Sequence, residues 1–320
     1  MVATSVNQRF SVLDLEDVSL TAGELNALQG APGTTYWVDS VNGSDVAANT
    51  GVKDSPFRTI TAALAKCVNN KGDQIIVKPN STWTYGAAAG VAINKVGVSI
   101  VGQGRGTNRP KIILDTATTA SLTVTAANVR IDNFVFEAAF ADVAQCFTVT
   151  AAEFHINACE FVEQATDENW VNIVDCSSGT AQTAKGLTIT NCRMTGVDAA
   201  TAAFITTAAE IDNLTFTGNY VARGANAAVL VLTAETAGDL FLGLNISDNN
   251  LQSKAAAHTG NLLLSDCTGA TNTGIIARNM IGHLTTTGAP GTELTGASWF
   301  ENYNTGAVDK SGFLLPAVDS

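Results

Sequence analysis

A short pattern of alternating apolar and polar residues, broken by a turn, recurs along the middle of this chain. Its copies are VRIDNFVF from Val129, FHINACEF from Phe154, LTITNCRM from Leu187, LTFTGNYV from Leu214, LNISDNNL from Leu244 and GIIARNMI from Gly274. They start 25, 33, 27, 30 and 30 residues apart, with an earlier copy at Val98 and a degenerate last one at Ser298. Most intervals also hold a second alternating run, such as FITT at Phe204 or VLVL at Val229.

Period-two alternation is typical of a strand with one buried face. A unit of this length with two or three short strands is too small to bury its own apolar face, so units must stack and share a core. Intervals vary while the strands stay aligned, because loops absorb the differences. The pattern therefore predicts an all-β fold, a right-handed single-stranded parallel β-helix.

One turn position of the repeat becomes asparagine in the later copies. It is Phe134, Cys159 and Cys192 in the first three copies, and then Asn219, Asn249, Asn279 and Asn302. Side chains stacked at such a turn are able to bond along the stack and to satisfy the backbone groups of the turn. We expect the four asparagines to form a structural ladder, rather than a metal or cofactor site.

The segment before the repeats differs from them. Tyr36–Val38 is expected to be a short strand, and Asn42-Gly43 a loop. Ser55 followed by Pro56 predicts a helix start, and Ile60, Ala63, Leu64, Cys67 and Val68 then recur at helical spacing. Such a helix would cap the open end of the stack. The boundaries we expect are 1–33 for an N-terminal arm, 34–73 for the first strand, loop and cap helix, 74–304 for the coils and 305–320 for a tail.

The run YWVDSVNGSD…TG…SPFRTITAAL resembles the N-terminal segment of many pectin-lyase-like β-helix proteins. That group includes polysaccharide-active enzymes, bacterial surface proteins and phage tailspikes. The resemblance covers residues 34–68 in motif and about 34–304 in architecture. It supports the same fold, and it says little about function, because one fold hosts many functions.

Composition excludes several classes of protein. Apolar residues make up 46% of the chain, with 14% charged residues and 7% aromatic residues, which argues against intrinsic disorder. No apolar stretch is long enough for a transmembrane helix, and the first residues do not read as a secretory signal. The net charge of −12 without a basic cluster argues against nucleic acid and anionic membranes as partners.

Catalysis on such a helix requires acids on successive coils. The second and fourth residues of the repeat should face outward, and they bring together Arg130, Asp132 and His155 as the best catalytic candidates. Glycoside hydrolysis needs two carboxylates, and these two columns offer only one. Asp39 and Asp45, near Asn42-Gly43, are weak calcium candidates, and turn stabilisation is the competing interpretation. We expect no cofactor and no catalysis. Exposed aromatic platforms for sugars are also few, because only Trp83 and Trp170 lie in loop-like sequence.

The two ends of the chain suggest docking. DVSLTAGELNALQGAPG, from Asp17, resembles the LTAAELNALDG segment that recurs in tail-fibre, spike and head proteins of tailed bacteriophages, and it departs at Gly23 and Gln29. Its Leu20, Leu25 and Leu28 would form one apolar helix face, too short to be stable undocked. At the other end, Phe313, Leu314 and Leu315 would either cover the last coil or dock on a neighbour.

These resemblances imply a non-catalytic structural protein of a phage virion: a spike, fibre or capsid-decoration component that folds in the host cytoplasm. Its partners would be itself, as a homotrimer, and another virion protein contacted through the N-terminal arm, with a host surface polysaccharide as a further candidate. The alternatives are a tailspike-type or secreted polysaccharide-degrading enzyme and a bacterial surface adhesin.

Overall fold

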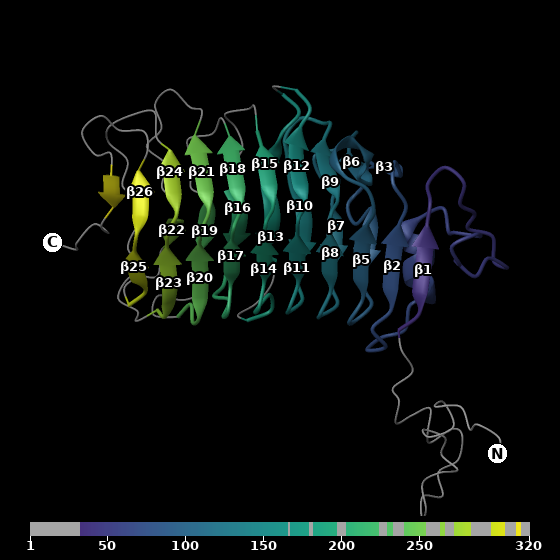
Figure 1. Ribbon diagram of the computed structural model, residues 1–320, viewed down its shortest axis with the longest axis horizontal. Helices are drawn as coiled ribbons and strands as arrows, with labels where there is room; N and C mark the ends of the chain where they lie inside the picture. Colours follow the sequence, from purple (N-terminus) through teal and green to yellow (C-terminus); the bar gives the residue numbers. More distant parts are fainter. Residues whose placement is uncertain are drawn as a thin grey trace, which may run out of the picture.

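The computed structural model describes residues 33–165, 167–178, 182–196, 203–223, 229–232, 240–253, 263–265, 272–282, 296–304 and 312–314. Their strands form three parallel sheets that run the length of a solenoid, with β1 (Thr35–Val38) at one end and β26 (Asn302–Asn304) near the other (Figure 1). We number the sheets I, II and III, and their strands are given below. Each full coil of the chain passes through sheet I, then sheet III, then sheet II. The predicted parallel β-helix is confirmed.

Sheet I contains the first alternating half of every repeat. Its strands are β1 (Thr35–Val38), β2 (Gln74–Val77), β5 (Ser99–Gly102), β8 (Arg130–Asp132), β11 (His155–Asn157), β14 (Thr188–Thr190), β17 (Thr215–Thr217), β20 (Leu244–Ser247), β23 (Gly274–Ala277) and β25 (Ser298–Phe300). The registers align the middle residues of the repeats, so that Ile131, Ile156 and Ile189 stack inside.

Sheet III follows sheet I after a corner, and sheet II closes the coil. Sheet III consists of β3 (Thr82–Tyr85), β6 (Lys111–Leu114), β9 (Val135–Ala138), β12 (Glu160–Glu163), β15 (Arg193–Thr195), β18 (Tyr220–Arg223), β21 (Asn250–Ser253), β24 (Met280–Gly282), β26 (Asn302–Asn304) and the antiparallel β27 (Gly312–Leu314). Sheet II consists of β4 (Val91–Ile93), β7 (Leu122–Val124), β10 (Val143–Val149), β13 (Trp170–Cys176), β16 (Ala203–Thr207), β19 (Leu230–Leu232) and β22 (Leu263–Ser265).

The core is a continuous column of aliphatic and phenylalanine side chains. Phe136 and Phe161 stack with ring centroids 5.4 Å apart, and Phe204 meets Phe161 edge-on at 5.3 Å. All three are fully buried. Apolar surface from every coil is thus removed from water only when the next coil is present, which explains why the repeat has to stack.

The N-terminal cap is a helix, α2 (Ile60–Lys66), that begins later than expected. Its N-cap is Thr59, whose hydroxyl accepts the Ala62 N–H at 3.1 Å. The predicted start at Ser55–Pro56 is wrong, because Phe57 is extended there and bonds to Trp37 of β1 at 2.8 Å. Ile60, Ala63 and Leu64 are buried on the first coil as expected, whereas Val68 is 53% exposed.

Candidate functional site

The structure brings together the trio expected on sheet I. Arg130 and His155 are register partners on β8 and β11, and Asp132 is the register partner of Asn157. The Asp132 carboxylate accepts hydrogen bonds from the Arg130 guanidinium at 2.9 Å and from the Asn157 amide at 2.8 Å. Hydrogen bonding to Asp132 and its charge raise the pKa of Arg130, against the opposing effect of burial. Arg130 and Asn157 thus fix the Asp132 carboxylate in place on the outer face of sheet I.

Glu153 adds a second carboxylate near this trio, which the sequence columns did not include. Its Oε2 lies 3.8 Å from His155 Nε2, and both side chains are partly exposed, at 45% and 40%. Ligand sites are usually concave. Here the polar groups stand on an outward sheet face whose further positions are Thr188, Thr190, Thr215 and Thr217, which favours a solvated surface.

The four asparagines of the expected ladder are stacked and fully bonded. Asn249 Oδ1 accepts the backbone N–H of Asn219 at 2.9 Å, and Asn249 Nδ2 donates to Phe216 O at 2.8 Å. The same two kinds of bond recur at Asn279 and Asn302, and all four side chains are at most 2% exposed. The ladder satisfies the backbone of successive corners.

The two calcium candidates make bonds within the N-terminal cap. Asp39 accepts the N–H groups of Val41 and Asn42 at 3.0 Å, and Asp45 accepts Thr59 Oγ1 at 2.8 Å. Burial raises the pKa of Asp39, but the hydrogen bonds from Asn42 and Val41 and the charge of Lys78 outweigh it and lower the pKa. In the part of the chain that the structure describes, no cluster of three or more His, Cys, Asp or Glu side chains is arranged to hold a metal ion.

The proposed docking residues are only partly described. Leu20, Leu25, Leu28 and Leu315 lie outside the described residues. The backbone of Phe313 and Leu314 forms β27, which pairs with β26 at the last coil.

Neither of the two tryptophans expected in loops is an exposed platform for sugars. Trp83 lies in β3 and is 9% exposed, and Trp170 lies in β13 and is fully buried. Among the described helices, none is long and apolar enough to cross a membrane.

A lateral groove of about 340 Å³ lies on sheet III in the described part of the chain. Its floor is Val135 and Val162, on β9 and β12. Its sides carry two carboxylates, Glu137 and Glu160, and two cations, Arg109 and Lys111, with Gly106 and Thr107 at one edge. We call this site the sheet III groove.

The two glutamates lie diagonally on neighbouring strands. Glu160 is the register partner of Val135, and Glu137 stands two residues further along β9. With strands about 4.8 Å apart and about 3.3 Å per residue, their Cα atoms are roughly 8 Å apart. Flexible glutamate side chains on Cα atoms at this spacing allow the two carboxyl groups to reach the separation of about 6.5–9.5 Å that leaves room for a water in single-displacement glycoside hydrolysis.

Each glutamate is paired with a cation. Lys111 Nζ donates to Glu137 at 2.7 Å, and the Arg109 guanidinium donates to Glu160. Arg193, on the next coil, has its Nε 3.9 Å from Glu160, and its guanidinium stacks on Tyr220 at 5.2 Å from the ring centroid. The groove therefore continues into a surface with a cation and an aromatic ring that is 36% exposed.

A signal for half of this site was present in the repeat. The seventh residue of successive copies is Val135, Glu160, Arg193, Tyr220, Asn250 and Met280, a column that faces outward on sheet III. The second and fourth positions of the repeat, which gave the catalytic candidates above, do not include this column. Arg109 lies between repeats, and only the folded corner brings it to Glu160.

Comparison with known proteins identifies the fold. No protein-family model matches the chain, and no curated protein does. Among solved structures, the chain is similar to a GH136 lacto-N-biosidase from Eubacterium ramulus, with a TM-score of 0.55 and 12% identity over 91% of this chain and 58% of that one. A rhamnogalacturonan lyase also matches, with a TM-score of 0.40 and 14% identity over 88% of this chain and 90% of that one. A pectin methylesterase matches with a TM-score of 0.44 and 13% identity over 90% of this chain and 94% of that one. The chain thus spans under two thirds of the length of the lacto-N-biosidase.

The expectation that the protein is not an enzyme is corrected by these comparisons. The solved structure that shares its fold with a TM-score of 0.55 is an enzyme, named a lacto-N-biosidase. The physical argument for the expectation also fails, because it rested on a missing second carboxylate and the sheet III groove holds two. The fold of this chain is that of the pectin-lyase-like right-handed parallel β-helix proteins.

Proposed function

We propose that this protein is a tailspike-type polysaccharide-degrading enzyme that hydrolyses glycosidic bonds in the sheet III groove. The observation that carries the proposal is the diagonal pair Glu137 and Glu160 above an apolar floor. Paired carboxylates flanking the scissile bond are what glycoside hydrolysis requires. The enzymes that share the fold support the class of substrate, a carbohydrate, without supplying the residues.

The two carboxyl groups have different surroundings, which suits different roles. The side chain of Glu137 is 11% exposed, and that of Glu160 is 26% exposed beside two guanidinium groups. We assign Glu137 as the acid, because it is the less exposed of the two carboxyl groups and contacts one cation, whereas Glu160 contacts two. Glu160 takes a proton from the attacking water, whose oxygen bonds to the anomeric carbon as Glu137 protonates the leaving oxygen. When the substrate enters, the ion pairs Arg109–Glu160 and Lys111–Glu137 have to break.

The test is turnover of purified protein on a panel of neutral and uronate-containing bacterial surface polysaccharides, followed as new reducing ends. We expect Glu137→Gln and Glu160→Gln each to lower the rate by about 10²–10⁴-fold, the usual contribution of general acid–base catalysis. Asp175→Asn, on an outward position of sheet II, is the matched control and should keep full activity. Circular dichroism checks that all variants are folded.

Two results would contradict this assignment. Activity that survives both glutamine substitutions but is lost in Asp132→Asn would move the site to sheet I. Absence of new reducing ends from every member of the panel would reject hydrolysis.

The virion setting is a further part of the proposal. The segment from Asp17 resembles a segment of phage tail-fibre, spike and head proteins, and it supports attachment to another virion protein through residues 1–33. We propose that the enzyme is a homotrimer on a phage particle, with a host surface polysaccharide as substrate.

A further inference from the structure

Outward side chains of sheet III continue in a column from the sheet III groove toward the C-terminal coils. Glu160 of β12 is the register partner of Arg193 on β15, and Arg193 is the register partner of Tyr220 on β18. With strands about 4.8 Å apart, the Cα of Arg193 lies one strand beyond Glu160, and that of Tyr220 lies about 10 Å beyond it. A polymer that leaves the groove in this direction passes over Arg193 and then Tyr220.

Arg193 differs from the other two cations beside the glutamates. Arg109 and Lys111 each donate directly to one glutamate of the groove, and their side chains are 14% and 37% exposed. The side chain of Arg193 is 62% exposed, and its Nε lies 3.9 Å from Glu160 and makes a long bond of 3.5 Å to Thr195 Oγ1. Toward the described residues its two Nη groups make no hydrogen bond, so they are available to a ligand.

The guanidinium of Arg193 is held in place by the ring of Tyr220. Its central carbon lies 5.2 Å from the ring centroid. A cation over an aromatic face is attracted by the quadrupole of the ring, and arginine carries its donors in a rigid planar fork. The pair therefore presents preorganised N–H donors at the surface, and hydroxyl oxygens are the acceptors that a glycan offers to such donors.

We infer that Arg193 is a sugar-binding residue next to the sheet III groove, and that Tyr220 is the residue that positions it. The inference rests on the proposed function and adds a subsite beside the cleaved bond. On the opposite side of the groove, Lys111 is the register partner of Thr82 on β3, whose outward side chains Thr82 and Thr84 are exposed and uncharged. The glycan is therefore held more strongly on the side of Arg193 than on the side of β3.

A positive charge close to Glu160 is the competing role of Arg193. Lysine at position 193 keeps this charge, but it lacks the planar fork and the stacking of a guanidinium on the ring of Tyr220. Phenylalanine at position 220 keeps the aromatic face and removes the hydroxyl. The conservative variants Arg193→Lys and Tyr220→Phe therefore separate hydrogen bonding to a sugar from a charge effect on the glutamate.

The first experiment measures kcat and KM on oligosaccharides of increasing length from the polysaccharide that responds in the panel. On the longer substrates, Arg193→Ala should raise KM about 10- to 100-fold, the contribution of hydrogen bonds to a charged group. It should leave kcat unchanged, because uniform binding affects KM alone. A substrate too short to reach Arg193 should show no change. Wild-type KM at every length, with normal turnover, would overturn the inference and leave hydrolysis in the sheet III groove standing.

Arg278→Ala is the matched control for the loss of an exposed arginine. Its guanidinium pairs with Asp248 at 2.7 Å on coils beyond Tyr220, so both kinetic constants should stay at their wild-type values. Circular dichroism checks that all variants are folded. An equal rise of KM in Arg278→Ala would show that the loss at Arg193 is a general effect of surface charge, and it would overturn the inference.

The second experiment uses the conservative variants on the longest substrate. We expect Arg193→Lys to keep the raised KM of Arg193→Ala, Tyr220→Phe to keep the wild-type KM, and Tyr220→Ala to raise it. Recovery of the wild-type KM by lysine would mean that charge alone is needed, and a loss in Tyr220→Phe equal to that in Tyr220→Ala would remove the positioning role of the ring.

The third experiment measures binding apart from turnover. Calorimetry with the longest oligosaccharide compares Glu160→Gln with the double variant that also carries Arg193→Ala, and the second substitution should weaken binding by the same factor as KM. Equal affinity of the two proteins would overturn the inference. A wild-type protein that neither binds nor cleaves any polysaccharide of the panel would reject the proposed function, and the inference with it.

Discussion

Asn219, Asn249, Asn279 and Asn302 show how one residue type at one position stabilises several coils. Each Oδ1 accepts a backbone N–H from the preceding coil, and each Nδ2 donates to a carbonyl oxygen there. Buried backbone groups that lose their partners are costly. Cys159 and Cys192 hold the same corner in earlier coils, where both side chains are buried in the core, and burial raises the pKa of the Cys159 thiol well above its ordinary value.

Removal of one asparagine should therefore destabilise its neighbours. Asn249→Ala leaves the Asn219 N–H and the Phe216 carbonyl without their side-chain partner, at a cost of about 1–3 kcal/mol for each orphaned group. Asn245→Ala is the matched control on the same coil, because this side chain lies on the outer face and bonds only to Ser247 in the described contacts. Urea unfolding followed by circular dichroism measures both, and equal stabilities would show that the ladder contributes nothing.

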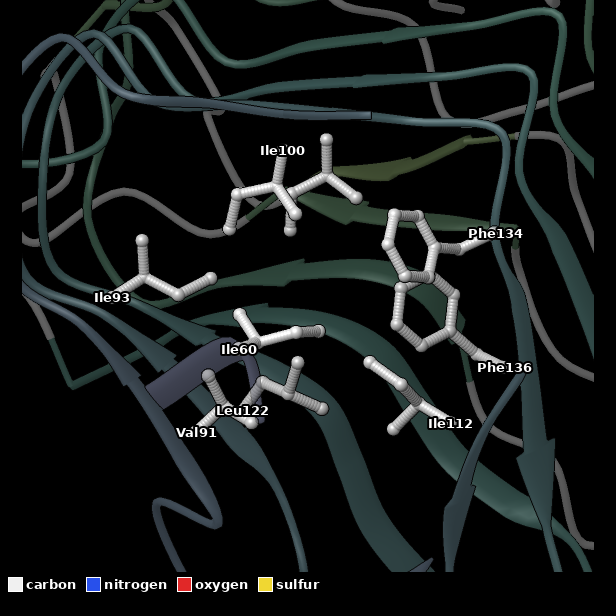
Figure 2. Close-up of a pocket in the computed structure, with 9 residues that line it drawn as sticks. Ile60, Val91, Ile93, Ile100, Ile112, Leu122, Phe134 and Phe136 are labelled. Atoms are coloured by element: carbon white, nitrogen blue, oxygen red, sulfur yellow. The ribbon is translucent and has the colours of Figure 1, made fainter. Parts of the chain in front are cut away.

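At the scale of elements, the caps and corners differ from coil to coil while the strands stay in register. Helix α2 covers the first coil with Ile60, and this side chain meets Ile100, Ile112 and Phe136 around an apolar cavity (Figure 2). The cavity measures about 10 Å³ and has no polar lining residue, so it is at the lower limit for one water and offers it no hydrogen bond. It is a packing defect under the cap, unlike the sheet III groove.

Ile60→Ala should enlarge this cavity and weaken the cap. Truncation of a buried isoleucine typically costs about 2–5 kcal/mol, because apolar contacts are lost and the site relaxes only partly. Thr61→Ala, on the exposed side of the same helix turn, is expected to change the free energy of unfolding by less than about 0.5 kcal/mol. Thermal melts of the two variants compare them directly, and an equal loss in both would mean that α2 does not act as a cap.

At the scale of the whole molecule, the solenoid presents long lateral faces, and the described part of sheet III carries a concave polar site. Sheet I offers hydroxyls and a bonded Arg130–Asp132 pair, whereas sheet III offers the carboxylate pair. The net charge of −12 adds a general repulsion for polyanions. We therefore expect the proposed enzyme to turn over a neutral polysaccharide of the panel faster than a uronate-containing one.

The arm can be tested by deletion of residues 1–33. The described coils begin with β1 at Thr35 and are covered by α2, so we expect the strand signal in circular dichroism and the turnover to be unchanged. Incorporation into phage particles should be lost. Normal incorporation without the arm would contradict its proposed role, and loss of the strand signal would show that residues 1–33 are needed for folding.

The repeat by itself determined the solenoid and the asparagine ladder. Alternation with period two assigns each side chain to the inside or the outside, and a fixed position in the repeat becomes a fixed place on the stack. Ile131, Ile156 and Ile189 stack inside, and Asn249 lies above Asn279, because the register keeps these columns in line. A local sequence pattern is sufficient to predict where a side chain lies wherever the structure repeats.

Only the tertiary structure decided what lies between the repeats. Ser55 and Pro56 resemble a helix start, but Phe57 pairs with β1 and delays the helix to Ile60. Arg109 meets Glu160 across 51 residues of sequence because the long connection between β5 and β6, Gln103–Pro110, carries it past an intervening coil. Glu160 of the sheet III groove follows the repeat, but Arg109 belongs to a single corner without periodicity, so the repeat predicts the fold and only part of the site.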